Sequence, residues 1–391
     1  MCSWRTLFII GALTGHVHTT PTSPTPTTTG APSHEPAVPS VQSTVPQTLT
    51  LTAWSADELE TFIFSSASSS HPLYIKAFAN VSDVYVLSAT LNIVAGADVK
   101  IVGCSVEQRG HVGISVLALS GGHVRRVVEV ASGATLTLWS IALIDGYHTQ
   151  QGAAMYSFGN VFLGNVVVAN NTCIASNAWI SGGILANFGG SYTLQHCEIV
   201  SNRVTQGTLQ NGISGGVVLF GDSTQSVRFS GVTLRNNTVN VTTSGQTIYG
   251  AIVSLSATQD NLISMTNLTF ESNQVAAGFV NGGLIQIYQG GDFTAARFLA
   301  RNNHIRAGND ISGGLIQLYE CGDFILSEAG LTGNTIKSVS GRFVIYAMHP
   351  HWPPYTDTDL RLTRGFKIHQ RYNQRRTGRR GSKRNNQLAL L

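Results

Sequence analysis

Charged residues and helix-forming stretches are scarce in this sequence. Asp and Glu together number 20 in 391 residues, and charged residues make up only 11% of the chain. Runs rich in Glu, Lys and Ala, which favour helices, are missing between residues 85 and 345. No glycine-rich phosphate loop, Ser-His-Asp or Cys-His arrangement or zinc-type cysteine spacing stands out. These absences argue against a helical central region, a phosphate-loop or nucleophilic enzyme, and a zinc protein.

The apolar segment near the N-terminus is too short to span a bilayer. Met1–Arg5 is a basic start, Leu7–Leu13 is apolar, and small or polar residues follow. This layout is typical of a secretory signal peptide, which we assign to residues 1–18. Residues 19–50 are rich in Thr, Ser and Pro and poor in large apolar groups, which predicts a disordered, O-glycosylated stalk.

What the sequence does contain is a repeat. A Gly that opens an apolar run and an Asn about twenty residues later recur six times, with a period of roughly 31 to 36 residues. The Gly positions are Gly152, Gly183, Gly216, Gly250, Gly283 and Gly314. The Asn positions are Asn171, Asn202, Asn237, Asn273, Asn303 and Asn334. A fixed period indicates one supersecondary unit stacked on itself, which buries an apolar face that no single copy could bury alone.

The repeated unit favours strands over helices. β-branched and aromatic residues dominate its apolar runs, and Gly and Asn separate them. Gly pairs and β-branched clusters would each cost about 0.5 to 1 kcal/mol in a helix, which disfavours helical repeats of similar period. Each copy divides into three short apolar runs. We therefore predict an all-β fold, a single-stranded parallel β-helix whose coils stack about 4.8 Å apart.

The recurring Asn residues suit the corners of such coils. Gly and Asn accept positive φ most readily, and each coil must turn several corners. Stacked Asn side chains can also hydrogen-bond along the stack and so satisfy amides that would otherwise be buried without partners. We expect the Asn column to be a structural ladder; the alternative is a column that binds a ligand.

Short phrases within the repeat resemble a known family. They are GGIL at Gly182, GGVV at Gly215, YGAI at Tyr249, GGLI at Gly282 and Gly313, and FESN at Phe270–Asn273. These phrases are similar to the GGxI and FxxN repeats of polymorphic outer-membrane autotransporters and of large protist surface proteins. The resemblance covers roughly residues 85 to 345 and implies a pectin-lyase-like, right-handed parallel β-helix.

The pattern also defines the ends of the coiled region. Ser55 and Glu58 form a capping box ahead of an apolar face, which predicts a helix over residues 55–66. We assign residues 51–84 to an N-terminal cap that covers the first coil, and residues 85–346 to the β-helix. Residues 347–391 remain as a basic tail, which we expect to be disordered.

Sequons and cysteines fit an exported protein. Five N-x-Ser/Thr sequons predict N-glycosylation at Asn80, Asn170, Asn236, Asn240 and Asn267. Besides Cys2 in the signal segment, the chain contains Cys104, Cys173, Cys197 and Cys321. Counted from the Asn column, Cys173 and Cys197 lie at different positions along their coils, too far apart for a disulfide to join them. We therefore expect mostly free, buried thiols. We place the protein outside the cell or at the cell surface.

The basic tail differs in charge from the rest of the chain. Residues 1–360 contain 14 basic and 20 acidic side chains, whereas residues 361–391 contain 10 basic and no acidic ones. A segment with RRTGRRGSKR at Arg375–Arg384 would bind polyanions by salt-sensitive attraction. The signal peptide disfavours a nuclear role, so we expect no nucleic-acid partner. The step from Arg376 to Arg379 is alternatively a processing site, and an unstructured end is the third possibility.

Carboxylates offer one weak catalytic hypothesis. Glycoside hydrolases need two carboxyl groups about 5 to 9.5 Å apart. Only Asp292 and Asp323 recur in register, which would stack them about 4.8 Å apart on neighbouring coils. A local duplication of the sequence, which places the same residue in two neighbouring turns, explains the pair more simply. A polysaccharide lyase or glycoside hydrolase is therefore the alternative, and we expect no metal or other cofactor.

A column of aromatic and amide residues is the other candidate site. Phe188, Leu255, Tyr288 and Tyr319 lie five residues beyond the repeat Gly. If they point outward, they form with Leu284, Leu315, Gln286 and Gln317 a flat strip suited to sugar rings or a partner surface. If they point inward, they belong to the core. The sequence as a whole favours adhesion, a surface coat or glycan recognition without catalysis, with extracellular glycans or surface proteins as partners.

Overall fold

The computed structural model describes residues 48–338 and 346–348, apart from residues 67–70, 80–83, 106–116, 176–177, 208–211, 244, 257–261, 289–292 and 320–323. All described residues belong to one compact unit, Pro46–Leu391. The predicted signal peptide and nearly all of the stalk and the basic tail lie outside the described residues. So do Asn80, Asp292, Asp323, Cys2 and Cys321.

The described residues form 37 strands and one helix, and the strands build four parallel sheets, here called A to D. Sheet A has sixteen strands: β1 (Leu49–Ala53), β2 (Leu73–Ala79), β3 (Val84–Val86), β5 (Asp98–Ser105), β6 (Leu117–Ser120), β8 (Thr135–Trp139), β9 (Ile141–Ile144), β12 (Asn160–Gly164), β13 (Val167–Ala169), β17 (Gly190–Gln195), β18 (Glu198–Val200), β22 (Thr224–Arg235), β26 (Leu262–Glu271), β30 (Phe293–Arg301), β34 (Phe324–Ser327) and β35 (Gly330–Thr332).

The other three sheets are smaller. Sheet B consists of β4 (Leu91–Ile93), β7 (Val128–Val130), β11 (Met155–Ser157), β16 (Leu185–Asn187), β21 (Val218–Phe220), β25 (Val253–Ser256), β29 (Ile285–Tyr288), β33 (Ile316–Tyr319) and β37 (Tyr346–Met348). Sheet C consists of β10 (Tyr147–His148), β14 (Thr172–Ala175), β19 (Arg203–Gln206), β23 (Thr238–Val241), β27 (Gln274–Ala277), β31 (His304–Ala307) and β36 (Thr335–Lys337). Sheet D consists of β15 (Ile180–Ser181), β20 (Ile213–Ser214), β24 (Thr247–Tyr249), β28 (Phe279–Asn281) and β32 (Ile311–Ser312).

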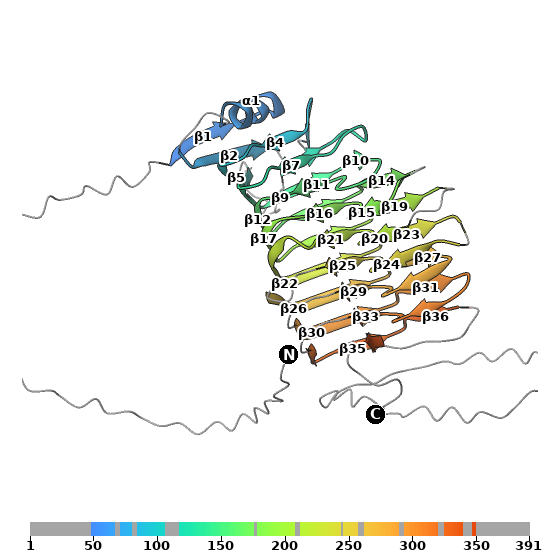
Figure 1. Cartoon of the computed structure of the whole chain (residues 1–391). Coiled ribbons are helices and arrows are strands. Elements are labelled where there is room, and N and C mark those ends of the chain that lie inside the picture. Colours follow the sequence, from blue (N-terminus) through green and yellow to red (C-terminus); the bar gives the residue numbers. More distant parts are fainter. Residues whose placement is uncertain are drawn as a thin grey trace, which may run out of the picture. The chain divides into compact units, whose positions relative to one another are not determined.

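The chain passes through the sheets in the order A, C, D, B and then returns to A. One such coil runs through β30, β31, β32 and β33 before β34 begins the next. Each strand pairs in parallel with its counterpart one coil later, so Ile285 lies opposite Ile316 and Gln286 opposite Gln317. Successive coils therefore stack in sequence order, as Figure 1 shows. The prediction of an all-β fold with parallel strands is confirmed.

Alternate side chains of each strand fill one continuous core between the sheets. Because strand residues alternate between two faces, the inward positions form columns of equivalent residues along the stack. Sheet A contributes Phe229, Phe270 and Phe298, all of which are fully buried. Burial of this apolar surface on every coil is the main stabilising contribution, at about 25 cal/mol per Å².

Each coil contains more turns than the three apolar runs predict. Sheet A strands bend where one residue adopts the left-handed conformation, as at His196 (φ 53°), Asn267 (φ 51°) and Arg297 (φ 56°). Sheet D, with strands of two or three residues, separates sheet C from sheet B. Single left-handed residues change the direction of the backbone without interrupting the interstrand ladder on either side.

Helix α1 (Ala56–Ser66) packs at the N-terminal end of the stack (Figure 1). The Ser55 hydroxyl accepts a hydrogen bond from the Glu58 backbone N–H at 3.2 Å, which caps the helix as predicted. Leu59 and Ile63 are buried against the core. Although the repeat pattern predicts a start at residue 85, sheet A begins at Leu49, because β1 pairs with β2 and β2 pairs with β5. At the other boundary, the predicted tail begins inside β37.

Candidate functional site

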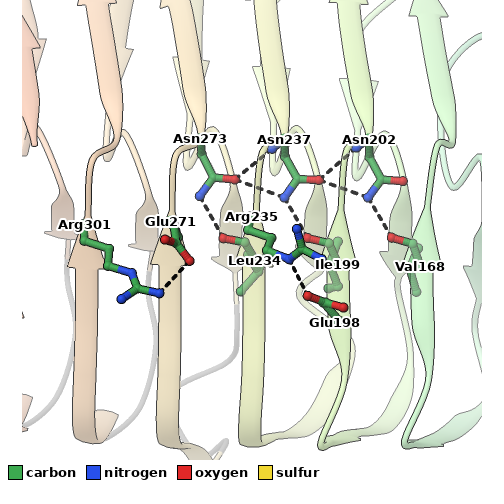
Figure 2. Close-up of polar contacts among 10 residues, drawn as sticks. All are labelled: Val168, Glu198, Ile199, Asn202, Leu234, Arg235, Asn237, Glu271, Asn273 and Arg301. Carbon is green, nitrogen blue, oxygen red and sulfur yellow. Dashed lines mark hydrogen bonds and ion pairs between the residues drawn. The ribbon is translucent and has the colours of Figure 1, made fainter. Parts of the chain in front are cut away.

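The six repeat Asn residues hydrogen-bond to one another along the corner between sheets A and C. The Oδ1 atom of Asn273 accepts from the backbone N–H of Asn237 and from its Nδ2 group, both at 3.0 Å. The Nδ2 group of Asn273 also donates to the Leu234 carbonyl at 2.9 Å, as Figure 2 shows. The same three bonds recur at the other steps of the ladder.

The ladder leaves no room for a ligand to bind. Asn171, Asn237, Asn273 and Asn303 are fully buried, and the bonds above use both the carbonyl and the amide of each side chain. At the N-terminal end, where the column has Gly146 instead of Asn, the Gly146 N–H donates to Asn171 Oδ1 at 2.7 Å. The Asn column therefore stabilises the stack, because it satisfies polar groups that would cost about 1 to 3 kcal/mol each if left unpaired.

A row of charged side chains lies on the outer surface of sheet A beside the ladder (Figure 2). Arg235 pairs with Glu198, and Arg301 pairs with Glu271 at 2.8 Å. The hydrogen bond that Arg235 donates to Glu198 raises the pKa of Arg235. All four side chains are partly exposed, and exposed pairs contribute only about 0 to 1 kcal/mol. Each charge has a partner, so this row does not present an uncompensated charge to a ligand.

The described sequons lie on sheets A and C or at the corner between them. Asn170 and Asn236 are exposed and each directly precedes a ladder Asn, with φ of 56° and 55°. Asn267 is exposed at the bend of sheet A, beside an open hollow of about 440 Å³ that Arg297 and Glu328 also line. Asn240 lies on sheet C and is half-buried. Among the described residues, sheets D and B contain no sequon.

A column of glycines forms the corner between sheets D and B. Its members have positive φ and are Gly152, Gly182, Gly215, Gly250, Gly282 and Gly313. A Cβ at Gly282 would lie 2.4 Å from the Ile285 carbonyl oxygen, so no larger side chain fits without a backbone shift. Outward side chains of the two sheets meet across this corner, where Gln317 Nε2 donates to the Ser312 hydroxyl at 3.1 Å. We call the outward surface of sheets D and B the D–B face.

The predicted binding residues divide between the floor and the edge of the D–B face. Gln286 and Gln317 are only 6% exposed, and Gln286 Nε2 donates to Gln317 Oε1 at 2.9 Å. They form part of a polar floor and are not open hydrogen-bonding groups. Tyr288 is 39% exposed. Tyr319 follows it in register, and its side chain lies outside the described residues.

Three members of the candidate strip point inward, which is the second of the two orientations that the sequence leaves open. Leu284 and Leu315 belong to the core, and Leu255 points inward and is fully buried. The residue opposite Tyr288 is Ser256. For Leu255 the cause is the register: Gly250 corresponds to Gly282 and not to Gly283, so Leu255 pairs with Ile287 and lies on the face opposite to Tyr288.

Aromatic rings that the sequence analysis did not single out lie on the sheet D side of this face. The Trp179 indole lies against the backbone of Gly212. A Cβ added to Gly212 would be only 2.9 Å from the indole ring. The indole stacks on Tyr249, with ring centroids 6.0 Å apart and an interplanar angle of 23°. Trp179 is 43% exposed, and Phe279 on β28 is 36% exposed. The shared column of Trp179, Gly212, Thr247 and Phe279 becomes visible only once the coil register is known.

A second aromatic cluster lies on the sheet B side of the same face. Tyr156 contacts Phe158 edge-on at 5.1 Å and Phe188 at 5.7 Å, measured between ring centroids. The Arg126 guanidinium lies over the Tyr156 ring, 4.5 Å from its centroid. In the outward column of sheet B, Tyr156 is followed by Ala186, Leu219 and Ser254, and the hydroxyl oxygens of Ser254 and Ser214 are 3.3 Å apart.

His148, on β10 of sheet C, lines the same hollow as Arg126 and Glu129 beside the N-terminal end of the D–B face, and it is in a neutral form. Its Nδ1 atom accepts hydrogen bonds from the backbone N–H groups of Gln150 at 3.1 Å and Gln151 at 3.0 Å. Burial lowers the pKa of His148 below its usual 6.5, and the nearby positive charge of Arg126 lowers it further. The ring proton is therefore on Nε2.

This arrangement predicts a loss of stability at low pH. The unfolded chain takes up the His148 proton near pH 6.5, before the folded chain does, so the free energy of unfolding should fall as the pH drops below 6.5. His148→Asn should reduce that fall, because an Asn oxygen can accept from the same turn without titrating. Denaturant unfolding of both proteins across this pH range measures the difference. Parallel pH profiles would contradict the assignment.

The described cysteines are free. Cys173 and Cys197 are buried, and Cys104 is partly buried. Burial raises the pKa of the Cys173 thiol to about 12 and that of Cys197 to about 11, so neither is a reactive nucleophile near neutral pH.

The described residues contain no group of three or more His, Cys, Asp and Glu side chains placed to hold a metal ion. They also contain no helix with the length and apolar character needed to cross a bilayer.

The sequence matches no protein-family model, and neither the curated proteins nor the solved structures compared with it include a match.

Proposed function

We propose that this chain is a right-handed, pectin-lyase-like β-helix of the cell surface or the secreted fraction, which recognises glycans on its D–B face without catalysis. The observation that carries the proposal is the exposed stack of Trp179 on Tyr249 beside a polar floor. Aromatic rings offer a flat apolar surface of the kind that packs against the carbon-bound hydrogens of a sugar ring. Phe279, in the same column as Trp179, extends this surface along the coils, and Tyr288 adds an exposed ring at the end of β29.

The floor of the face suits the hydroxyl groups of the same ligand. Ser214, Asn281 and Ser312 are partly exposed at outward positions of sheet D. The buried side chains of Ser254 and Gln317 hydrogen-bond to Ser214 and Ser312 and hold them in place. Amide and hydroxyl groups both donate and accept hydrogen bonds, as sugar hydroxyls do. A site of this kind combines apolar rings with a small number of fixed polar groups, which is usual for binding sites of small ligands.

The distribution of sequons supports the choice of this face. If the protein follows the secretory route, the glycans on Asn170, Asn236, Asn240 and Asn267 would cover sheets A and C, and the D–B face would stay open. Binding of a surface glycan by an exported β-helix fits adhesion or a surface coat.

Replacing Trp179 by Ala tests the proposal. Binding of oligosaccharides of glucose, galactose, mannose, xylose and N-acetylglucosamine should identify at least one ligand for the parent protein. Trp179→Ala should weaken that binding roughly tenfold or more, because it removes a large part of the apolar platform. Isothermal titration calorimetry measures the change.

Trp139→Ala is the matched control. Trp139 is exposed to a similar degree and stacks on Phe162 with centroids 5.9 Å apart, but it lies on sheet A. Its loss should leave the affinity unchanged. A protein that binds none of these sugars, or one in which only Trp139→Ala weakens binding, would refute a glycan site on the D–B face.

A further inference from the structure

A hollow of about 390 Å³ opens at the N-terminal end of the D–B face. It is lined by Thr90, Val124, Arg125, Arg126, Glu129, Tyr147, His148 and Thr149. Glu129 occupies the outward column of sheet B that continues through Tyr156 and Ala186. The hollow therefore lies in line with the aromatic surface, one coil beyond Tyr156.

Arg126 is fixed in place and its charge is compensated. The Nε group donates to the Gly152 carbonyl at 2.9 Å, and one terminal nitrogen donates to the Gln151 carbonyl at 2.8 Å. The other terminal nitrogen pairs with Glu129 at 2.7 Å. Removal of a guanidinium held by so many contacts would disturb the coil itself, so Arg126 shapes the wall of the hollow.

Arg125 supplies the uncompensated charge. Its guanidinium donates to the Leu87 carbonyl at 3.0 Å, and it makes no ion pair among the described residues. The charged groups that line the hollow are thus Arg125, Arg126 and Glu129, with a net charge of one positive unit. A lone guanidinium beside a sugar-binding surface favours a negatively charged group on the ligand.

His148 adds a directed donor to the same hollow. Its Nδ1 atom accepts from the turn that contains Gln150 and Gln151, which leaves the Nε2 hydrogen without a partner among the described residues. Hydroxyl-bearing side chains of Thr90, Tyr147 and Thr149 complete the lining. The lining therefore combines one free positive charge with several neutral hydrogen-bonding groups.

We propose that this hollow binds a sugar residue that carries one anionic group, which pairs with Arg125, while the neighbouring sugar of the same glycan packs against Tyr156. The inference rests on the proposed function, since it names the class of glycan that the D–B face takes. The anionic group is a carboxylate or a sulfate. Either one can accept the hydrogen bonds that a guanidinium and an imidazole N–H donate.

Three probes with a common core test this inference: lactose, sialyllactose and sulfated lactose. The parent protein should bind at least one of the two anionic sugars about tenfold more tightly than lactose, since hydrogen bonds to charged groups are the stronger ones. Arg125→Gln should abolish this preference, so that the variant binds the anionic sugars no more tightly than it binds lactose. Preference for sialyllactose alone identifies a carboxylate site, and preference for both identifies a general monoanion site.

Arg228→Gln is the matched control, because Arg228 is an exposed residue of sheet A whose loss changes the net charge equally. It should preserve the preference for the anionic sugars. Equal affinities of the parent for all three probes, no binding of any probe at millimolar concentration, or an unchanged preference in Arg125→Gln would overturn the inference.

If Trp179→Ala weakens lactose binding while Arg125→Gln changes nothing, only the anionic site fails. If Arg125→Gln removes the preference while Trp179→Ala changes nothing, only the aromatic surface fails.

Discussion

Replacing Asn303 by Leu should lower the free energy of unfolding by roughly 3 kcal/mol or more. The Asn303 side chain accepts from the backbone N–H and the Nδ2 group of Asn273 at 3.0 and 2.9 Å, and donates to Asn334 Oδ1 at 2.8 Å. It also donates to the Phe270 carbonyl at 3.0 Å. Leu leaves these buried groups without partners, and each such group costs about 1 to 3 kcal/mol. Chemical denaturation measures the loss.

Asn302→Ser is the control for this change. Asn302 has a φ of 55° and is exposed, and Ser201 and Ser272 adopt the same conformation at the equivalent positions of other coils. The substitution should change stability by less than about 0.5 kcal/mol. In Asn303→Leu, hydrogen-exchange protection should fall first in the coils around residues 273–334 and persist near residue 152, because coils contact only their neighbours. Equal effects of the two substitutions, or an even loss of protection, would show that the ladder does not stabilise the stack.

Gly282→Ala should have the second-largest effect on stability, roughly 2 to 4 kcal/mol. The residue has a φ of +68°, which costs an L-residue about 1 to 2 kcal/mol. The new Cβ would also lie 2.4 Å from the Ile285 carbonyl oxygen and 3.0 Å from Gln286 Cβ. Since the first of these atoms belongs to the backbone, the corner itself has to move, and thermal or chemical unfolding should report the cost.

Gly96→Ala separates the two causes. Gly96 has a φ of +78°, and nothing lies within 4 Å of its missing Cβ. It should therefore lose only the conformational part, about 1 kcal/mol. If both substitutions cost the same, the tight contact at the corner between sheets D and B is absent.

The Asn column could be read from the sequence, because its chemistry is distinctive. A polar residue that returns at a regular interval between apolar runs must find a partner when buried, and another Asn one coil away provides it. The insertions between coils change the spacing by several residues, but they leave Asn202, Asn237 and Asn273 recognisable. The helix before the first coil could be predicted for a similar reason, since Ser55 and Glu58 form a local signal.

The outward face could not be predicted as well, because strand faces depend on a register of single residues. Gly250 stands alone, whereas most other corners have a Gly pair, so the sequence does not show which Gly of each pair it matches. Counting from the wrong Gly groups Leu255 with Tyr288, although Leu255 pairs with Ile287 and is buried. Trp179, Tyr249 and Phe279 lie at unequal distances in the sequence and come together only through the pairing of β15, β20, β24 and β28.

Hydroxyl-radical footprinting of the glycan complex tests the central claim most directly. The probe is the oligosaccharide that the parent protein binds most tightly in the calorimetric panel. Oxidation of Trp179, Tyr249 and Phe279 should fall when this ligand is bound, whereas oxidation of Trp139 on sheet A and Trp54 beside α1 should stay the same. Protection of Trp139 or Trp54 with Trp179 unchanged would place the ligand elsewhere and contradict a glycan-binding D–B face.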